Sequence, residues 1–163
     1  FIIAIVFTSC NTSVESEKIA GKWLLDDSRF EKGYMAGDQK DYDLVKQFLD
    51  AYENMDPQGM VDLSAETVKF HPADAAGVFD VDMTNTDFIV ERQSNWDSIS
   101  RNYIFIMPLK MEDSKNRVVT TAFTETRYVK DGTSESINFY ERLYINEQDQ
   151  IMRVVQYSRP PND

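Results

Sequence analysis

The stretch after residue 100 alternates four long runs of β-branched and aromatic residues with short polar clusters. The runs cover residues 103–111, 118–129, 136–145 and 151–158. Residues of these types favour strands, whereas the Gly, Asn, Asp and Ser of the intervening clusters favour turns. Strands that are joined by short turns pair antiparallel. The sequence therefore predicts an antiparallel meander in this part of the chain.

A helical pattern precedes these runs. The apolar residues that carry it recur every three or four positions: Tyr42, Val45, Phe48, Leu49, Tyr52 and Met55. Asp41 lies where an N-cap would stand, and the spacing predicts a helix over residues 42–55. Asp56 followed by Pro57 predicts a second, short helix that runs to Leu63.

Two further elements are predicted before residue 100. Thr67–His71 has the composition of a strand and is followed by Pro72, which ends it. A third helix is predicted from Asn85 or Thr86 to near Ile99. Helices followed by a meander give an α+β order, and we expect the helices to cover one face of a curved sheet around a pocket.

Charge and cysteine content exclude several classes of function. The chain has 163 residues and a net charge of −11, with one cysteine and one histidine. This length suits a single domain with its own core, and the acidic balance argues against nucleic acid or an anionic membrane surface as partner. A single cysteine excludes an internal disulfide, and the low Cys and His content excludes a zinc cluster of those residues. With no glycine-rich phosphate loop and no metal-ligand spacing in the sequence, we expect neither a cofactor nor a metal.

The start of the chain has the pattern of a bacterial lipoprotein signal. The apolar run over residues 1–10 is shorter than the ~20 residues that span a bilayer. Its end, Phe7-Thr8-Ser9-Cys10, resembles a lipobox, in which small residues precede a lipidated cysteine, although Phe7 replaces the usual Leu. The alternative is a free cysteine at the start of a strand.

The lipobox resemblance implies an organisation for the whole chain. Residues 1–10 would be the end of the signal, residues 11–17 a polar linker, and residues 18–40 an N-terminal extension before the domain. Lipidation of Cys10 would anchor the protein to a membrane of the bacterial cell envelope, on its periplasmic or outer surface. We expect contact with a membrane only through this anchor.

Several stretches between residues 41 and 158 resemble the SnoaL-like branch of the nuclear transport factor 2-like superfamily. They are residues 45–56, 60–63 and 68–72 for its opening elements, and 139–145 and 150–157 for its last two strands. The resemblance implies a cone-shaped, cystatin-like α+β barrel, with a curved antiparallel sheet around an apolar pocket. This fold occurs in ketosteroid isomerases, polyketide cyclases and dehydratases, and also in non-catalytic binding or dimerisation modules.

The same resemblance suggests residues for chemistry. It places His71 where isomerases keep a general-base aspartate, and Glu141 where isomerases and cyclases keep an acidic residue that faces the pocket. A His and a Glu in one low-dielectric pocket would form an acid–base pair. Phe48 stands where isomerases have a tyrosine, and a phenyl ring cannot donate the hydrogen bond that stabilises an enolate. Steroid-type isomerisation is therefore disfavoured.

The alternatives for these two residues are structural. His71 would be a hydrogen-bonded residue at a strand end, and Glu141 would pair with an arginine of a neighbouring strand. The arginines available for that pairing are Arg127, Arg142 and Arg153. The expected walls of the pocket are the aromatic residues Phe48, Tyr52, Trp96, Tyr103 and Phe105. Core packing is the alternative for these aromatics.

Three functions follow from these observations. The leading hypothesis is a lipid-anchored domain that binds a small apolar or amphipathic molecule. The second is an enzyme of the dehydratase, cyclase or isomerase kind that uses His71 and Glu141, and the third is an interaction module that forms a homodimer. Gly21-Lys22-Trp23 also resembles the G-x-W of lipocalin-like barrels, which keeps an all-strand barrel as an alternative fold.

Overall fold

A computed structural model describes residues 18–115 and 117–161. In chain order its elements are β1 (Gly21–Lys22), β2 (Gly33–Ala36), α1 (Gln39–Glu53), α2 (Pro57–Asp62), β3 (Ser64–His71), β4 (Phe79–Asp82), α3 (Asp87–Gln93), β5 (Trp96–Met111), β6 (Arg117–Val129), β7 (Ser134–Ile145) and β8 (Ile151–Arg159). Helices first and long strands afterwards confirm the predicted α+β order. Among these residues no helix is long and apolar enough to cross a membrane.

The strands form a single curved sheet in the order β1-β2-β5-β6-β7-β8-β3-β4. The edge strands β1 and β4 do not pair with each other, so the sheet is not closed into a barrel, and with the helices this excludes the all-strand lipocalin-like alternative. The predicted antiparallel meander is confirmed in β5 to β8, and β3 pairs with β8 in parallel. Parallel strands need a long crossover connection, and here the whole chain from β4 to β7 provides it.

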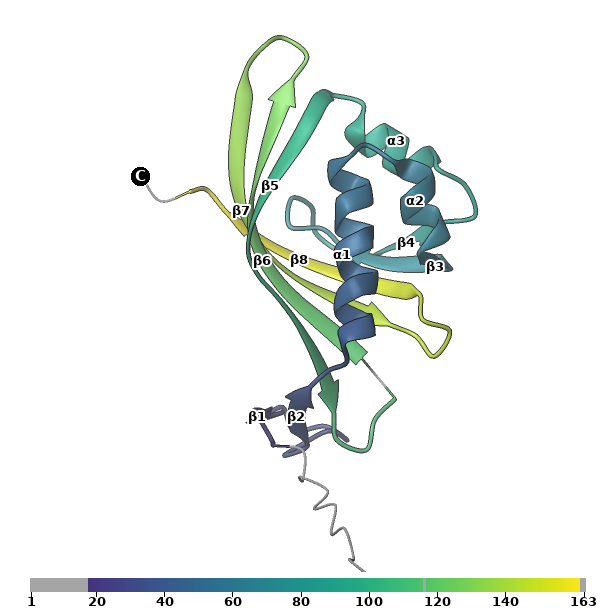
Figure 1. Cartoon of the computed structure of the whole chain (residues 1–163), viewed down its shortest axis with the longest axis vertical. Coiled ribbons are helices and arrows are strands. Elements are labelled where there is room, and N and C mark those ends of the chain that lie inside the picture. The colour runs from purple at the N-terminus through teal and green to yellow at the C-terminus, as the bar shows by residue number, and fades with distance from the viewer. Residues whose placement is uncertain (1–17, 116, 162–163) are drawn as a thin grey trace, which may run out of the picture.

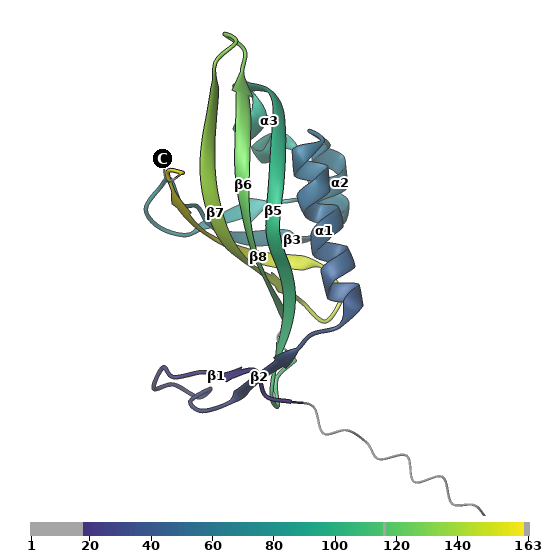
Figure 2. The same cartoon turned by 60° about the vertical axis from the view of Figure 1, so that its left-hand side comes forward.

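The helices cover the concave face of the sheet, as Figures 1 and 2 show. On α1 the residues Val45, Phe48 and Leu49 are buried, because their spacing places them on one side of the helix. They belong to a core cluster that includes Leu143 of β7 and Ile151 of β8. The helical pattern of the sequence is thus the stripe that holds α1 against the sheet.

The helix starts differ in part from the prediction. The N-cap of α1 is Asp38, whereas Asp41 lies in the first turn, where it is 2% exposed. Asp41 accepts a hydrogen bond from Nη1 of Arg117 at 2.8 Å, so its role is an ion pair with the sheet rather than a cap. α2 begins as predicted, because the Asp56 side chain accepts a hydrogen bond from the backbone N–H of Gly59 at 3.0 Å.

The third helix is shorter than predicted. α3 ends at Gln93, and Trp96 already belongs to β5, where it pairs with Val129 of β6. The extension of β5 toward the N-terminus follows from the length of its partner β6, whose backbone hydrogen bonds continue to Val129. Pairing with a distant strand therefore overrides the local helical spacing.

The N-terminal extension forms a hairpin of β1 and β2 against the lower end of β5. Figure 2 shows this hairpin on the side of the sheet away from the helices. The ring of Trp23 packs on the guanidinium of Arg29 at 3.9 Å and contacts Tyr34 at 6.4 Å between ring centroids. Trp23 is therefore part of a small cluster within the hairpin rather than of the main core.

Candidate functional site

A cavity of about 80 Å³ lies between the helices and the concave face of the sheet. Its wall is mainly apolar and is formed by Phe48, Leu49, Tyr52, Met60, Val68, Phe70, Val81, Met83, Phe88, Ile89 and Val154. The polar residues of the wall are Arg92, Arg101, Glu125, Arg127, Glu141 and Gln156. A cavity needs roughly 10–15 Å³ of such volume to hold one water molecule. The cavity therefore has room for a few water molecules or for one compact group of a ligand.

Strand alternation places the polar wall on the concave face. On β6 Glu125 and Arg127 follow Phe123 at intervals of two, and all three are buried. Arg101 of β5 is the Cα partner of Glu125, and Gln156 of β8 is the Cα partner of Glu141 of β7. Direct cross-strand neighbours lie close enough to interact, so each carboxyl group meets its partner across one strand pair.

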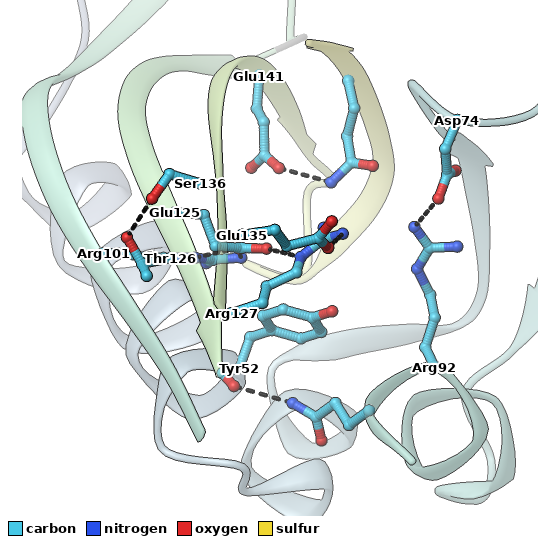
Figure 3. A network of polar contacts seen from close by, with 12 residues as sticks. Tyr52, Asp74, Arg92, Arg101, Glu125, Thr126, Arg127, Glu135, Ser136 and Glu141 are labelled. Atoms are coloured by element: carbon cyan, nitrogen blue, oxygen red, sulfur yellow. Dashed lines mark hydrogen bonds and ion pairs between the residues drawn. The ribbon is translucent and has the colours of Figure 1, made fainter. Parts of the chain in front are cut away.

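Arg101, Glu125 and Arg127 form a buried chain of ion pairs, shown in Figure 3. Nη2 of Arg101 lies 2.6 Å from Oε2 of Glu125, and Nε of Arg127 lies 2.6 Å from Oε1 of the same carboxylate. Arg127 also reaches Glu135 at 3.4 Å. The side chains of Arg101 and Glu125 are 4% and 1% exposed. Both oxygens of the Glu125 carboxylate are therefore engaged by arginines.

Aromatic rings pack against the guanidinium groups of Arg101 and Arg127. The guanidinium of Arg101 lies 4.7 Å from the ring centroid of Tyr52 and 4.6 Å from that of Phe123. Arg127 lies 4.3 Å from the ring of Trp96. Such cation–π contacts gain strength where water is excluded. Burial lowers the pKa of Arg101, but Glu125 and Glu141 outweigh it and raise the pKa above its ordinary value, so this arginine stays charged.

Glu141 differs from Glu125 because no described arginine forms an ion pair with it. Its Oε1 accepts a hydrogen bond from Nε2 of Gln156 at 2.6 Å, and the residue is 2% exposed. Burial raises the pKa of Glu141, while Arg101 and the Gln156 hydrogen bond oppose the rise. A carboxyl group that is desolvated in a cavity can stay protonated near neutral pH and donate a hydrogen bond.

Gln156 completes the polar corner of the cavity. Its Oε1 is buried and has no hydrogen-bond partner among the described residues. A buried acceptor without a donor is costly. The Glu141–Gln156 pair therefore offers a bound molecule a carboxyl group and an amide oxygen side by side.

Arg92 of α3 belongs to the polar wall and is partly exposed to solvent. Its Nη2 lies 3.1 Å from Oδ2 of Asp74, and its guanidinium lies 5.2 Å from the ring of Phe70. The neighbouring Gln93 donates to the backbone carbonyl of Tyr52 at 2.8 Å, which ties α3 to α1. The position of α3 over the cavity is thus fixed by a buried side chain.

The structure brings some of the expected pocket residues to the cavity and leaves others outside it. Phe48, Tyr52 and Glu141 line it. Trp96 packs on Arg127, and Tyr103 packs on Phe123 at 5.6 Å between centroids, so neither is a lining residue. Phe105 is 36% exposed on the convex face, because a bulge in β5 between Tyr103 and Phe105 shifts the alternation.

His71 and Glu141 are not brought together. Val68 and Phe70 of β3 line the cavity, so alternation directs His71 to the opposite, convex face. Burial lowers the pKa of His71, as do the charges of Arg153 and Lys69. The expected acid–base pair of His71 and Glu141 is therefore wrong, and the partner of Glu141 is Gln156 rather than His71 or an arginine.

The charged wall of Arg101, Glu125 and Arg127 is absent from the sequence prediction. A signal for it exists, since Glu125 and Arg127 interrupt the inward face of a strand whose other inward residues, Val119, Thr121 and Phe123, are buried. In the described part of the chain no three His, Cys, Asp or Glu side chains are grouped to hold a metal ion.

The sequence matches no protein-family model and no curated protein, whereas solved structures resemble it. A protein from Shewanella denitrificans OS-217, named as a SnoaL-like polyketide cyclase, has a TM-score of 0.57 at 9% identity over 75% of this chain and 92% of that chain. An NTF2-like protein from Burkholderia xenovorans LB400 has a TM-score of 0.52 at 16% identity over 76% and 92%. This chain has the nuclear transport factor 2-like fold.

A third NTF2-like neighbour has a different name. It is an LEH-like epoxide hydrolase from M. tuberculosis, with a TM-score of 0.56 at 12% identity over 74% of this chain and 83% of that chain. One NTF2-like scaffold thus carries proteins named for different chemistries, and function has to be argued from the cavity of each chain.

Proposed function

We propose that this protein binds a small molecule whose apolar part fills the cavity and whose hydrogen-bond donor, such as a hydroxyl group, meets Glu141 and Gln156. The observation that carries the proposal is the unpaired, buried Oε1 of Gln156 beside the buried carboxyl of Glu141 in an apolar wall. A few polar groups in an apolar pocket are the usual arrangement of a small-molecule site.

The size of the cavity narrows the class of molecule. Pockets that enclose a drug-sized ligand measure about 300–1,000 Å³, whereas this cavity measures about 80 Å³. A single ring or a short branched chain fits, and a longer amphipathic molecule would leave its remainder outside. Arg92, which is partly exposed, would lie near an acidic or polar tail of such a molecule.

Native mass spectrometry of the protein from its native source tests the proposal. We expect a bound molecule in the wild type and its loss in Val154→Phe, because the larger ring fills the cavity. Val155→Phe adds the same volume at the next position, on the other face of β8, and should keep the molecule. The proposal fails if the wild type carries nothing or if both variants keep it.

A second candidate function is proton transfer by Glu141, favoured by its burial and raised pKa in the cavity. Under this candidate Glu141→Gln still binds the molecule but no longer converts it, because the amide cannot exchange a proton. Incubation in D2O decides the matter, because a carbon-bound proton that is exchanged through Glu141 is replaced by deuterium and raises the mass of the molecule released from the wild type but not of that released from Glu141→Gln. Equal deuterium content in the two leaves binding as the function.

The lipid anchor remains a proposal because Cys10 lies outside the described residues. Its support is the order of apolar run, small residues, cysteine and polar linker in the sequence. Cys10→Ser should release the protein from membranes in a fractionation of bacterial cells. Membrane association that survives the substitution contradicts the anchor and the proposed envelope location.

A row of exposed aromatics on the convex face supports a homodimer. Phe105 contacts Tyr140, and Tyr140 contacts Tyr157, with distances of 6.3 and 6.4 Å between the ring centroids. Their exposed fractions are 36%, 42% and 59%. Exposed aromatic clusters of this kind mark interaction sites. Tyr140→Lys should convert a dimer to a monomer in light scattering, and a monomeric wild type contradicts the proposal.

A further inference from the structure

Two arginines of the convex face differ from the other partly buried arginines because no described carboxylate pairs with them. They are Arg142 of β7 and Arg153 of β8, both half-buried. The others all have a carboxylate partner: Arg29 with Asp27, Arg92 with Asp74, Arg101 and Arg127 with Glu125, and Arg117 with Asp41. In an acidic chain, the lack of a partner at two neighbouring arginines points to an anion from elsewhere.

The two arginines lie around one ring. The guanidinium of Arg142 is 5.6 Å from the ring centroid of Tyr144, and that of Arg153 is 5.2 Å from the same centroid. Tyr144 is the Cα partner of Arg153 across the strand pair, and Arg142 precedes Tyr144 by two positions on the same face. Two cations therefore lie beside the same ring with no described carboxylate to offset them, and an anion that reaches both would do so.

Both arginines also carry an unused donor. The Nε atoms of Arg142 and Arg153 are buried and have no hydrogen-bond partner among the described residues. A buried N–H group without an acceptor is costly, and more so when the group is charged. The side chains are nevertheless only half-buried, so oxygens of a small anion from the solvent can approach their guanidinium groups.

The N-terminal hairpin adds a third donor. Nη2 of Arg142 donates a hydrogen bond to the hydroxyl oxygen of Tyr34 on β2 at 3.2 Å. Since that oxygen acts as acceptor, its own hydrogen remains available to a ligand. The hairpin that contains Tyr34 projects on the convex side of the sheet (Figure 2). The N-terminal extension therefore contributes to the convex face and not to the concave cavity.

We propose that Arg142, Arg153 and the hydroxyl of Tyr34 bind a phosphate group on the convex face. A phosphate carries close to two negative charges at neutral pH and matches the two unpaired guanidinium groups. The planar fork of arginine donors suits its oxygens geometrically. The phosphate is either inorganic or part of a small phosphomonoester.

Calorimetric titration of the full chain at constant ionic strength tests the site, with inorganic phosphate and glycerol phosphate as probes and chloride as the reference. Arg142→Gln and Arg153→Gln should each weaken binding at least tenfold. Arg159→Gln removes the same charge from an exposed position on β8 and should change binding less than twofold. Tighter binding of glycerol phosphate than of inorganic phosphate assigns the site to a phosphomonoester, and the reverse assigns it to the free ion.

Three results overturn the proposal: no binding above the chloride reference, equal weakening in Arg159→Gln, or arginine variants that change the oligomeric mass without changing phosphate binding. The last result would assign the arginines to a carboxylate of a second copy. Arg153→Lys guards against loss of folding, because it keeps the charge and removes the fork. It should still weaken binding, and thermal unfolding checks that each variant is folded.

His71 provides a second readout because it is the only histidine of the chain. Its pKa is lowered by burial and by the charge of Arg153. A bound dianion offsets that charge, so the pKa should rise toward its ordinary value when sulfate, which stays a dianion over this range, is added during an NMR titration. In Arg153→Gln the rise should occur without sulfate, and a His71 pKa that sulfate leaves unchanged contradicts the site.

Discussion

Glu125 of β6 lies directly opposite Arg101 of β5, and its Oε2 accepts a hydrogen bond from Nε of that arginine at 2.8 Å and lies 2.6 Å from its Nη2. The other oxygen of the same carboxylate is taken by Nε of Arg127 at 2.6 Å. One glutamate thus pairs with both arginines, and Glu135 is a second carboxylate partner of Arg127. The floor of the cavity is therefore charged but internally balanced, and Glu141 is left as the carboxyl group available to a ligand.

Glu125→Gln should lower the free energy of unfolding by about 3–5 kcal/mol, because it leaves buried arginine charge uncompensated. Urea unfolding monitored by tryptophan fluorescence measures the loss. Asp80→Asn provides the control, since it breaks the exposed pair with Lys69, which should be worth at most about 1 kcal/mol. Equal losses in the two variants would show that the buried network adds nothing to stability.

The long elements of the fold follow from pattern alone. The four strands after residue 100 match β5 to β8, although β5 begins seven residues before the predicted Tyr103, and the stripe on α1 matches its buried face. The hairpin of β1 and β2 and the short strand β4 have no comparable pattern. Their strand structure depends on pairing with β5 and β3, and such long-range pairing is not encoded locally.

The candidate site was predictable only in part for the same reason. Alternation with Phe139 and Leu143 places Glu141 on the buried face, as its burial shows. Applied to β3, the same alternation would have directed His71 away from Val68 and Phe70. The partnership of Arg101 with Glu125 depends on the register between two strands, which a bulge in β5 shifts, and a sequence does not reveal that register.

Arg117→Gln should also be strongly destabilising, since Arg117 connects the sheet to the first turn of α1. Its Nη1 is the described partner of the buried Asp41, and its Nη2 lies 2.6 Å from Asp149. Loss of the partner of a buried carboxylate costs about 3–5 kcal/mol. Chemical denaturation should show this loss, whereas Lys40→Gln, at the exposed pair with Asp149, should cost at most about 1 kcal/mol. A small effect of both would mean that Asp41 is protonated in the native protein.

Gly37 and Gly21 differ in the space around them, so their alanine substitutions provide a matched test of backbone packing. A Cβ at Gly37 would lie 2.8 Å from backbone atoms of Pro108 and Leu109 on β5, whereas a Cβ at Gly21 would meet nothing within 4 Å. Gly37→Ala should therefore cost about 1–3 kcal/mol through overpacking, and Gly21→Ala should change stability by about 0.5 kcal/mol or less. Thermal unfolding distinguishes them. Equal melting temperatures would contradict the close approach of the hairpin end to β5.

Glu141 should make stability fall as the pH rises. Burial raises the pKa of Glu141 in the folded protein above its value in the unfolded chain. Between the two pKa values the folded state binds more protons than the unfolded state, so the stabilisation is complete below the unfolded pKa and is lost as the pH rises through the folded pKa. Glu141→Gln cannot titrate and should lack this component.

The measurement is the difference in unfolding free energy between the wild type and Glu141→Gln from pH 4 to pH 8. Asp27 and Asp149 have lowered pKa values, so they make stability rise with pH in the acidic range. Their contribution is the same in both proteins, and the subtraction cancels it. We expect the wild type to lose stability relative to the variant as the pH increases. A difference that is flat, or that increases in favour of the wild type, would show that Glu141 is ionised in the cavity, and proton transfer by Glu141 would lose the raised pKa that favours it.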